Sequence, residues 1–221
     1  MINPKKLVGE KAAEYVKNGM KVGLGTGSTA SFAIEAIGSM VKQGLKVTCF
    51  PTSIASEQLA DSLSIPLLEE HEVDRLDLTI DGADEVDTNK NLIKGGGGAL
   101  LREKIVGKIS DQYIIIVDDS KLVAQLGAFS VPVEVVPFAW EVTANHINQL
   151  GGETTLREAD DGFFKTDNGN FILDSDFGLL EDPAALEIEL NMIPGVVCNG
   201  LFIGMADLII SANNKGDIEV F

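Results

Sequence analysis

The sequence has few of the residues that disulfide frameworks and zinc sites require. Among 221 residues there are two cysteines, Cys49 and Cys198, and two histidines, His71 and His146. The cysteines lie far apart and neither belongs to a closely spaced Cys/His motif, so we expect two reduced, buried thiols. We expect each histidine to be solvated or in the core rather than catalytic or bound to a metal.

Basic residues are also scarce, with 17 lysines and arginines against 34 acidic residues and a net charge of −17. Such a surface repels nucleic acid and anionic membranes, so neither is expected as a partner. No run approaches the roughly 18 apolar residues of a membrane span. Met1 to Tyr15 lack the apolar core of a signal peptide, which favours a cytoplasmic location. A phosphorylated substrate would need a local site made of lysines and backbone N–H groups.

Strand-like and helix-like segments alternate as far as about residue 120. A hydrophobic content of 45% is enough for a packed core. This alternation predicts an α/β fold with a Rossmann-like doubly wound sheet. The expected strands are apolar runs suited to a parallel sheet, at residues 21–25, 45–50, 76–80 and 113–117.

The pattern changes after Gly127 and predicts a second, smaller α+β domain. A final strand pair at the C-terminus could return to the first domain. The predicted domains are therefore 1–126, joined by 203–221, and 127–202. The expected elements of the smaller domain are strands at 131–136 and 196–202, helices at 139–150 and 183–192, and a hairpin at 163–173 turned at 167–170.

A glycine-rich segment, Gly23–Ala30, joins the first expected strand to a helix. Such turns let phosphate oxygens approach backbone N–H groups at the positive end of a helix dipole. The segment fits the dinucleotide pattern G-x-G-x-x-A, but the acid expected about 20 residues later is missing where the second strand ends at Phe50-Pro51. A turn with a Ser/Thr cap and no ligand is the alternative. The hydroxyl residues suit one phosphate better than a pyrophosphate: Thr26, Ser28 and Thr29.

Four acids lie in the seven residues Asp81–Asp87, directly behind an expected central strand. Sheets of this class place their sites at such strand ends. Asp81 and Asp84 could instead form a solvated Asx turn or a Mg²⁺ site. Lys94 and the four glycines Gly95–Gly98 lead into an expected helix at 99–109. That junction is either a natural anion site or the edge of a flexible loop.

Glu103 lies on this expected helix among neighbours that cannot pair with it. The residues three and four positions away are apolar or glycine, so no ion pair within the helix is available. Burial there would raise the pKa of Glu103 toward the range useful for a general base. A surface glutamate is the alternative. Lys121 follows another strand and is either a surface lysine or a contact to a sugar or its phosphate.

Taken together, these motifs resemble those of type A ribose-5-phosphate isomerases. The resemblance extends over nearly the whole chain. Gly98 is a departure, because alanine is expected after three glycines. The matching motifs are Gly25–Thr29, Asp81–Asp84, Lys94–Gly97, Arg102–Lys104, Asp119–Lys121, Pro132–Val135 and Ile193–Val197.

The resemblance implies interconversion of D-ribose 5-phosphate and D-ribulose 5-phosphate through an enediolate, in the pentose phosphate pathway. It implies no metal or organic cofactor, and a homodimer. Glu103 would be the general base, with Asp81, Asp84 and Lys94 as further catalytic residues. The implied substrate-binding residues are Thr26, Gly27, Ser28, Thr29, Asp81, Gly82, Ala83, Asp84, Lys94, Gly95, Gly96, Gly97 and Lys121.

Three other functions are compatible with parts of this pattern. A non-catalytic sugar-phosphate sensor could use the same scaffold, although the chain is strongly acidic and has no basic helix-turn-helix. A CoA transferase could use Glu103 as a nucleophile. A Rossmann oxidoreductase is disfavoured because the acid that would hold the ribose is missing.

Overall fold

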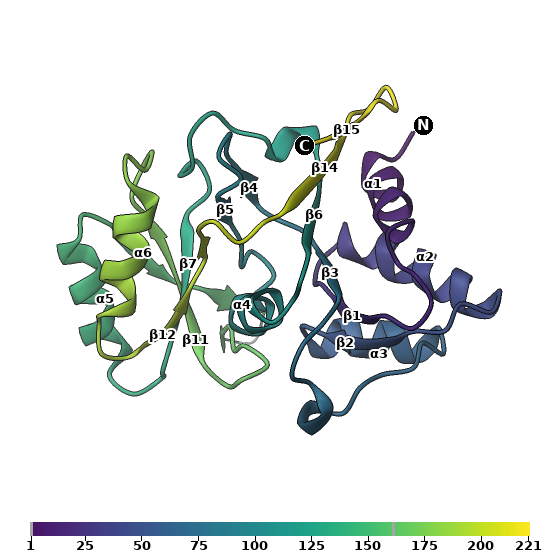
Figure 1. Cartoon of the computed structure of the whole chain (residues 1–221). Helices are drawn as coiled ribbons and strands as arrows, with labels where there is room; N and C mark the ends of the chain where they lie inside the picture. The colour runs from purple at the N-terminus through teal and green to yellow at the C-terminus, as the bar shows by residue number, and fades with distance from the viewer. Residues whose placement is uncertain (1, 161) are drawn as a thin grey trace. The chain divides into compact units, whose positions relative to one another are not determined.

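The computed structural model describes residues 2–160 and 162–221, which form two compact units (Figure 1). Unit 1 comprises the residues through Ala83, Arg102–Leu122 and Met205–Phe221. Unit 2 comprises Asp84–Leu101 and Val123–Gly204. Residues 84–101 fall within the predicted first domain, whereas their contacts group them with unit 2. The predicted domain bounds themselves stay a prediction.

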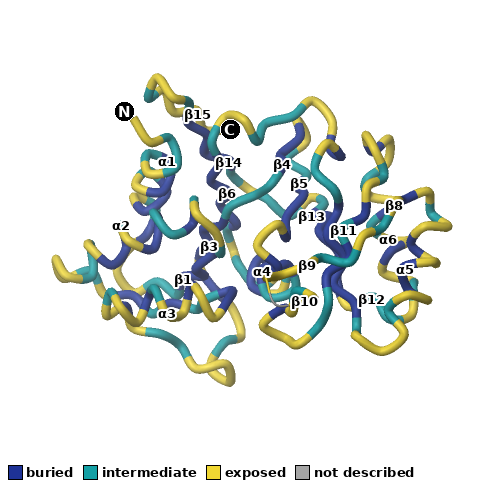
Figure 2. The backbone as a smooth tube through the Cα atoms, turned by 180° about the vertical axis from the view of Figure 1, so that it is seen from behind, coloured by how far each residue is buried: buried dark blue, intermediate teal, exposed yellow. Residues whose placement is uncertain are grey.

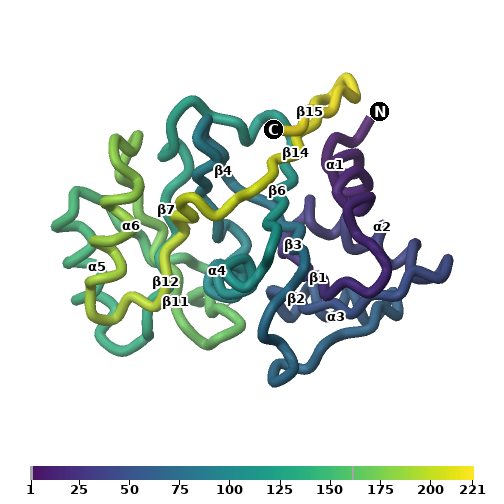
Figure 3. Tube along the Cα trace, viewed as in Figure 1, coloured from purple at the N-terminus to yellow at the C-terminus, as the bar shows by residue number. Residues whose placement is uncertain are grey.

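Unit 1 is built on a six-stranded sheet with helices on both faces. Each strand in the spatial series β2, β1, β3, β6 and β14 is parallel to its neighbours in that series, and β15 is antiparallel to β14. This arrangement confirms the predicted α/β class. Figure 3 shows β14, in yellow, returning to lie beside β6, with β15 on its other side. In spatial order the strands are β2 (Thr48–Pro51), β1 (Lys21–Leu24), β3 (Leu78–Asp81), β6 (Tyr113–Asp118), β14 (Leu208–Ala212) and β15 (Ile218–Val220).

The two faces of this sheet are covered by different helices. Successive side chains of a strand point to opposite faces. Ile114 and Ile116 of β6 join a buried cluster with residues of α1, α2 and α3, whereas Tyr113 contacts Gly107 of α4 on the other face. Figures 1 and 2 show α1 and α2 on one side of the strands and α4 on the other. Burying each such large apolar side chain contributes roughly 1.5–3 kcal/mol. The helices are α1 (Pro4–Ala13), α2 (Ala30–Lys42), α3 (Ile54–Ser62) and α4 (Leu100–Lys108), with short 3₁₀ turns η1 (Glu70–Glu72) and η2 (Asp119–Lys121).

The strand order places a topological switch point between β1 and β3. Strand β1 has β2 on one side and β3 on the other. After β2 the chain therefore crosses to the opposite side of β1, and the later strands extend the sheet in that direction. In open parallel sheets, ligands bind beyond the carboxyl ends of the strands at such a point. The segments there are the glycine turn after Leu24 and the acidic turn that begins at Asp81.

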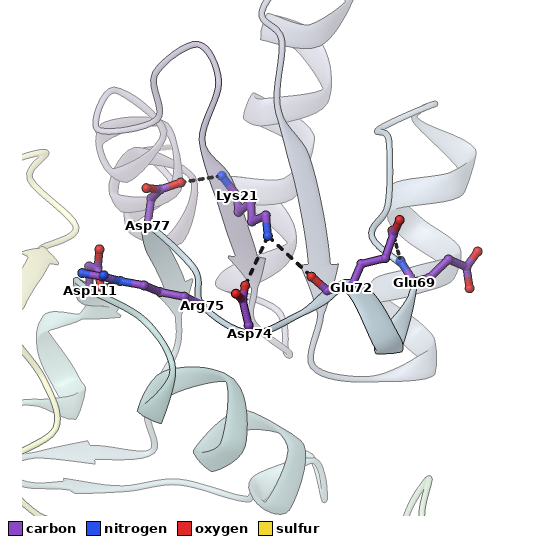
Figure 4. A network of polar contacts seen from close by, with 7 residues as sticks. All are labelled: Lys21, Glu69, Glu72, Asp74, Arg75, Asp77 and Asp111. Carbon is purple, nitrogen blue, oxygen red and sulfur yellow. Dashed lines mark hydrogen bonds and ion pairs between the residues drawn. The ribbon is translucent and has the colours of Figure 1, made fainter.

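The amino ends of the same strands carry an exposed polar network (Figure 4). The backbone N–H of Lys21 donates to Asp77 Oδ2 at 2.7 Å, and the Lys21 ammonium lies 3.4 Å from Asp74 Oδ1. Arg75 pairs with Asp111 nearby. Exposed ion pairs of this kind contribute little to stability. Residues of this network are therefore suitable for control substitutions in experiments on the opposite end of the sheet.

Unit 2 is an α+β unit around a four-stranded antiparallel sheet. The expected hairpin at 163–173 is wrong: β10 pairs with β9, and β11 pairs with β7 and β8. The turn at 166–170 does form, since the N–H of Thr166 donates to Asn170 O. The sheets are β12 (Val196–Asn199), β7 (Val131–Val135), β11 (Phe171–Asp176), β8 (Glu153–Leu156); β13 (Leu201–Phe202), β5 (Leu92–Ile93), β4 (Glu85–Val86); and β10 (Gly162–Phe163), β9 (Glu158–Ala159), with helices α5 (Trp140–Gln149) and α6 (Pro183–Asn191).

Both cysteines are free and buried, as expected. Burial raises the pKa of the Cys49 thiol on β2 from 9.0 to about 12. None of the helices in the described part of the chain is long and apolar enough to cross a membrane.

Alkaline pH should destabilise the protein through Cys49. The folded state binds the thiol proton more tightly than the unfolded state. The contribution of this proton to the free energy of unfolding is therefore complete below pH 9.0 and is lost as the pH rises toward 12. The free energy of unfolding should fall by up to about 1.4 kcal/mol per pH unit from this group. Urea denaturation of wild type and Cys49→Ala at pH 8, 9 and 10 measures it. Equal slopes in the two proteins would contradict the assignment.

Candidate functional site

The turn after β1 holds the first group of predicted site residues in unit 1. Gly25 lies directly against Asp81, and a Cβ at Gly25 would stand only 2.5 Å from Asp81 Cα. Gly27 adopts a φ of +106°, which favours glycine. The carbonyl of Gly27 accepts hydrogen bonds from the N–H and hydroxyl of Ser31, at 3.0 Å each, as α2 begins. The sequence thus forms a tight turn into a helix N-terminus.

The hydroxyl groups of this turn have different surroundings. Thr26 Oγ1 lies 2.7 Å from the hydroxyl of Thr52 and 2.8 Å from that of Ser53. Ser28 is exposed, and Thr29 makes no side-chain hydrogen bond as the helix cap. Thr29 therefore does not cap the helix through its side chain, while ligand binding by the turn stays a prediction. The hydroxyl of Thr26 supports the turn from within unit 1, while Ser28 lies on its open side.

Lys5 is a candidate residue that the sequence analysis missed. Its ammonium group donates to Ser28 Oγ at 2.9 Å, so α1 brings a positive charge to the glycine turn. The two residues are 23 positions apart, and no local motif links them. A weak signal did exist, because Lys5 lies in the first turn of a helix, where the helix dipole disfavours a cation.

Asp81 ends β3 and is completely buried. Its Oδ1 accepts hydrogen bonds from the N–H groups of Thr26, at 3.1 Å, and Gly82, at 2.8 Å. Its Oδ2 accepts one from the hydroxyl of Tyr113, at 2.9 Å. These donors fix the orientation of the carboxylate beside the glycine turn.

Tyr113 connects Asp81 to the helix that carries Glu103. Burial, followed by the charges of Asp81 and Glu103, raises the pKa of Tyr113 well above 10, so the phenol stays protonated and donates. Its ring packs on Gly107, one helical turn after Glu103. From the sequence, Tyr113 is only the start of an expected strand. Its signal was chemical, because a tyrosine in a central strand needs a partner for its hydroxyl.

Glu103 is buried, with 4% of its surface exposed. The alternative of a surface glutamate is therefore wrong. The hydroxyl of Tyr113 donates to Asp81 and its ring packs on the helix that carries Glu103, so this tyrosine links the two carboxylates. Unit 1 thus brings Asp81 and Glu103 together, whereas no sequence motif linked them.

Lys121 is half-buried in η2, just beyond the carboxyl end of β6. The preceding turn is held by Asp118, whose carboxylate accepts a hydrogen bond from the N–H of Ser120 at 3.2 Å. Since β6 is parallel to β3, Lys121 lies at the same edge of the sheet as Asp81.

Unit 2 holds the second group of predicted residues. Asp84 Oδ2 accepts a hydrogen bond from the N–H of Gly96 at 2.8 Å. Lys94 is 2% exposed, its N–H donates to Gly200 O at 2.9 Å, and its ammonium lies 5.4 Å from the centre of the Phe202 ring. A buried ammonium over an aromatic face is stabilised by a cation–π interaction. The Asp84 turn and the Lys94–Gly98 loop therefore form one hydrogen-bonded arrangement.

Residues suited to a metal ion are not clustered in the part of the chain that the structure describes. Residues 2–160 and 162–221 contain no group of three or more His, Cys, Asp or Glu side chains placed to hold one. Both histidines are exposed, which agrees with a solvated role. Cofactor independence stays a prediction.

The fold and its polar residues define an α/β protein with a tight glycine turn beside buried carboxylates. Residues 48–216 match the family described as Ribose 5-phosphate isomerase A (phosphoriboisomerase A). Ribose-5-phosphate isomerase A of Bacillus mycoides (strain KBAB4) is 51% identical over 98% of each chain, and that of Listeria innocua is 48% identical over 100% of this chain and 99% of the other. The chain belongs to the ribose 5-phosphate isomerase A family.

Solved structures agree with this membership. A D-ribose-5-phosphate isomerase in complex with phospho-erythronic acid superposes with a TM-score of 0.95 at 39% identity, covering 100% of this chain and 99% of that one. The ribose 5-phosphate isomerase A of Methanocaldococcus jannaschii gives 0.93 at 42% identity, covering 98% and 97%.

Proposed function

We propose that this protein interconverts D-ribose 5-phosphate and D-ribulose 5-phosphate through an enediolate. One observation carries the proposal: Tyr113 links buried Asp81 to the helix of buried Glu103, beside a glycine turn whose Ser28 contacts Lys5 of α1. Family membership supports the substrate. A base, together with a glycine turn able to bind an anion, both at the carboxyl ends of the strands, is suited to proton transfer on a phosphorylated sugar.

In the proposed reaction, Glu103 removes the proton from C2 of the open-chain aldose. The electron pair of the C–H bond forms the C1=C2 bond, and the aldehyde oxygen takes the negative charge. Glu103 then returns the proton to C1, while the C2 hydroxyl gives up its proton as it becomes the ketone and O1 gains one. No oxidant or reductant is consumed. Asp81 and Asp84 assist ring opening, and the ammonium of Lys94 supplies the positive charge that stabilises the enediolate.

The anionic end of the substrate is assigned to unit 1 residues around the glycine turn. In a chain with a net charge of −17, a phosphate requires local cations and N–H donors. Lys5 and Ser28 are already in contact, and Lys121 lies at the same sheet edge. We assign the phosphate to Thr26–Thr29, Lys5 and Lys121.

Removing either lysine should mainly weaken substrate binding. Lys5→Ala and Lys121→Ala should each raise KM about 10-fold with a smaller change in kcat, as expected for a charge-assisted contact made equally in ground and transition states. Inorganic phosphate should compete with substrate. Lys6→Ala is the matched control, since Lys6 is exposed and faces Glu10 at 3.7 Å. An unchanged KM in a folded variant would remove that lysine from the site.

A direct assay tests the function as a whole. Ketose should form from ribose 5-phosphate without any acyl-CoA. Tight binding without turnover would favour a sensor, and acyl transfer from an acyl-CoA would favour a transferase. A homodimer and a cytoplasmic location belong to the same proposal, and sedimentation analysis of the purified protein tests the first of them.

A further inference from the structure

Arg157 of unit 2 is held in place by hydrogen bonds of both its backbone and its side chain. It lies between β8 and β9, its N–H donates to Ile172 O at 2.9 Å, and its carbonyl accepts from the N–H of Phe164 at 2.9 Å. Only 14% of its side chain is exposed. Both its backbone and its side chain are therefore held.

The guanidinium group bridges a carboxylate and the glycine loop. Nε donates to Asp174 Oδ2 at 2.8 Å and Nη2 donates to Asp174 Oδ1, which is a bidentate pair. Nη1 donates to the carbonyls of Gly95, at 2.9 Å, and Gly96, at 3.1 Å. Asp174 thus fixes the plane of the guanidinium, and the remaining nitrogen binds two consecutive peptide groups.

These two contacts determine how the loop is oriented. In a planar trans peptide, the C=O and N–H bonds point in opposite directions. With the carbonyls of Gly95 and Gly96 turned to Arg157, the N–H groups of Gly96 and Gly97 point to the other side. The N–H of Gly96 there meets Asp84 Oδ2 at 2.8 Å. The peptide between Gly95 and Gly96 is therefore held at one end by Arg157 and at the other by Asp84.

Phe164 completes the support of this loop. Its ring lies 5.6 Å from the Arg157 guanidinium carbon, and a Cβ at Gly98 would stand 2.4 Å from the ring. Gly98 has a φ of +76°. The glycine found where the family resemblance led us to expect alanine therefore fits the position of Phe164.

We propose that Arg157 is a positioning residue for the isomerisation. It acts with Asp174 and Phe164 to hold the Lys94–Gly98 loop in the orientation in which Asp84 and Lys94 are presented to substrate. Glycines have the largest conformational freedom to lose, so a loop of four glycines needs an external restraint to stay in one arrangement. The inference rests on the proposed function, in which Asp84 and Lys94 act on the sugar.

Arg157→Ala should lower kcat for ribose 5-phosphate by about 10- to 100-fold, because small displacements of catalytic groups are costly in rate. KM should change much less, since the phosphate is assigned to residues of unit 1. Arg157→Lys should remain impaired, because an ammonium cannot reproduce the fork that binds a carboxylate and two carbonyls together. Millimolar guanidinium chloride should restore part of the kcat of Arg157→Ala and leave wild type unchanged.

Arg75→Ala is the matched control. Arg75 also pairs with an aspartate, Asp111, but is 72% exposed in the polar network of Figure 4. Its removal should change neither kcat nor the response to guanidinium. A folded Arg157→Ala with kcat within twofold of wild type would overturn the proposal. If Arg157→Ala does not fold, Asp174→Asn replaces it, and an unchanged kcat in that variant has the same consequence.

Amide hydrogen exchange separates this inference from the proposed function. Loss of the Arg157 contacts should speed exchange at Gly96 and Gly98, and Arg75→Ala should not. If wild type makes no ketose, the proposed function fails, while faster exchange still supports the role of Arg157 in the loop. If wild type is active and exchange at Gly96 is unchanged in Arg157→Ala, the positioning role is overturned alone.

Discussion

Glu103→Gln is expected to lower kcat by about 10²–10⁴-fold while the fold stays intact, the usual contribution of a general base. Glutamine keeps the shape of a buried side chain and removes its capacity to accept a proton. Steady-state kinetics with ribose 5-phosphate measure kcat, and circular dichroism checks the fold. Substrate binding should remain, because the phosphate is assigned to the glycine turn and its lysines.

Solvent isotope incorporation tests the same assignment independently. Wild type reacting in deuterated water should place some deuterium at the position that receives the proton, since an enediolate can exchange before it is reprotonated. Complete lack of exchange would leave a shielded proton or a hydride shift. Near-normal turnover by Glu103→Gln would exclude Glu103 as the base altogether.

Asp81→Asn is expected to lower kcat by about 10²–10³-fold with little change in stability, because the carboxylate is proposed to assist ring opening by proton transfer, a contribution typically worth about 10²–10⁴-fold. The amide oxygen can keep the hydrogen bonds from Thr26 and Gly82, and the amide nitrogen can donate to Tyr113 if the phenol turns to accept. The variant therefore changes charge but not connectivity. Kinetics and thermal melting measure the two effects separately.

Asp81→Ala and Asp77→Asn are the comparison variants. Alanine leaves one buried and two partly buried donors without their acceptor, and a buried unsatisfied donor costs about 1–3 kcal/mol, so Asp81→Ala should melt at a lower temperature. Asp77 precedes the same strand and accepts the N–H of Lys21 at the opposite end of the sheet (Figure 4). Asp77→Asn should be nearly as active as wild type. If Asp81→Asn were as active as Asp77→Asn, the proposed catalytic role of Asp81 would be contradicted.

The buried position of Glu103 could be predicted from the sequence, because helix periodicity fixes which side chains are neighbours. The parallel sheet could be predicted for a similar reason, since apolar β-branched runs alternate with helices. The prediction of a hairpin at 163–173 was wrong because the residues at 167–170 indicate a turn but do not specify which strands pair. Pairing depends on the partners β7, β8 and β9, which are distant in sequence or separated by irregular segments.

The sequence by itself determined the α/β class, the glycine turn before Ala30, the acidic turn after Ile80 and the family, because each of these depends on neighbours along the chain. Only the tertiary structure decided which groups meet across long separations. Lys5 meets Ser28, Tyr113 meets Asp81, and Arg157 meets Gly95 and Gly96. The physical reason is that these hydrogen bonds are a few ångströms long, and strand order and helix packing alone bring their donors within that distance of their acceptors.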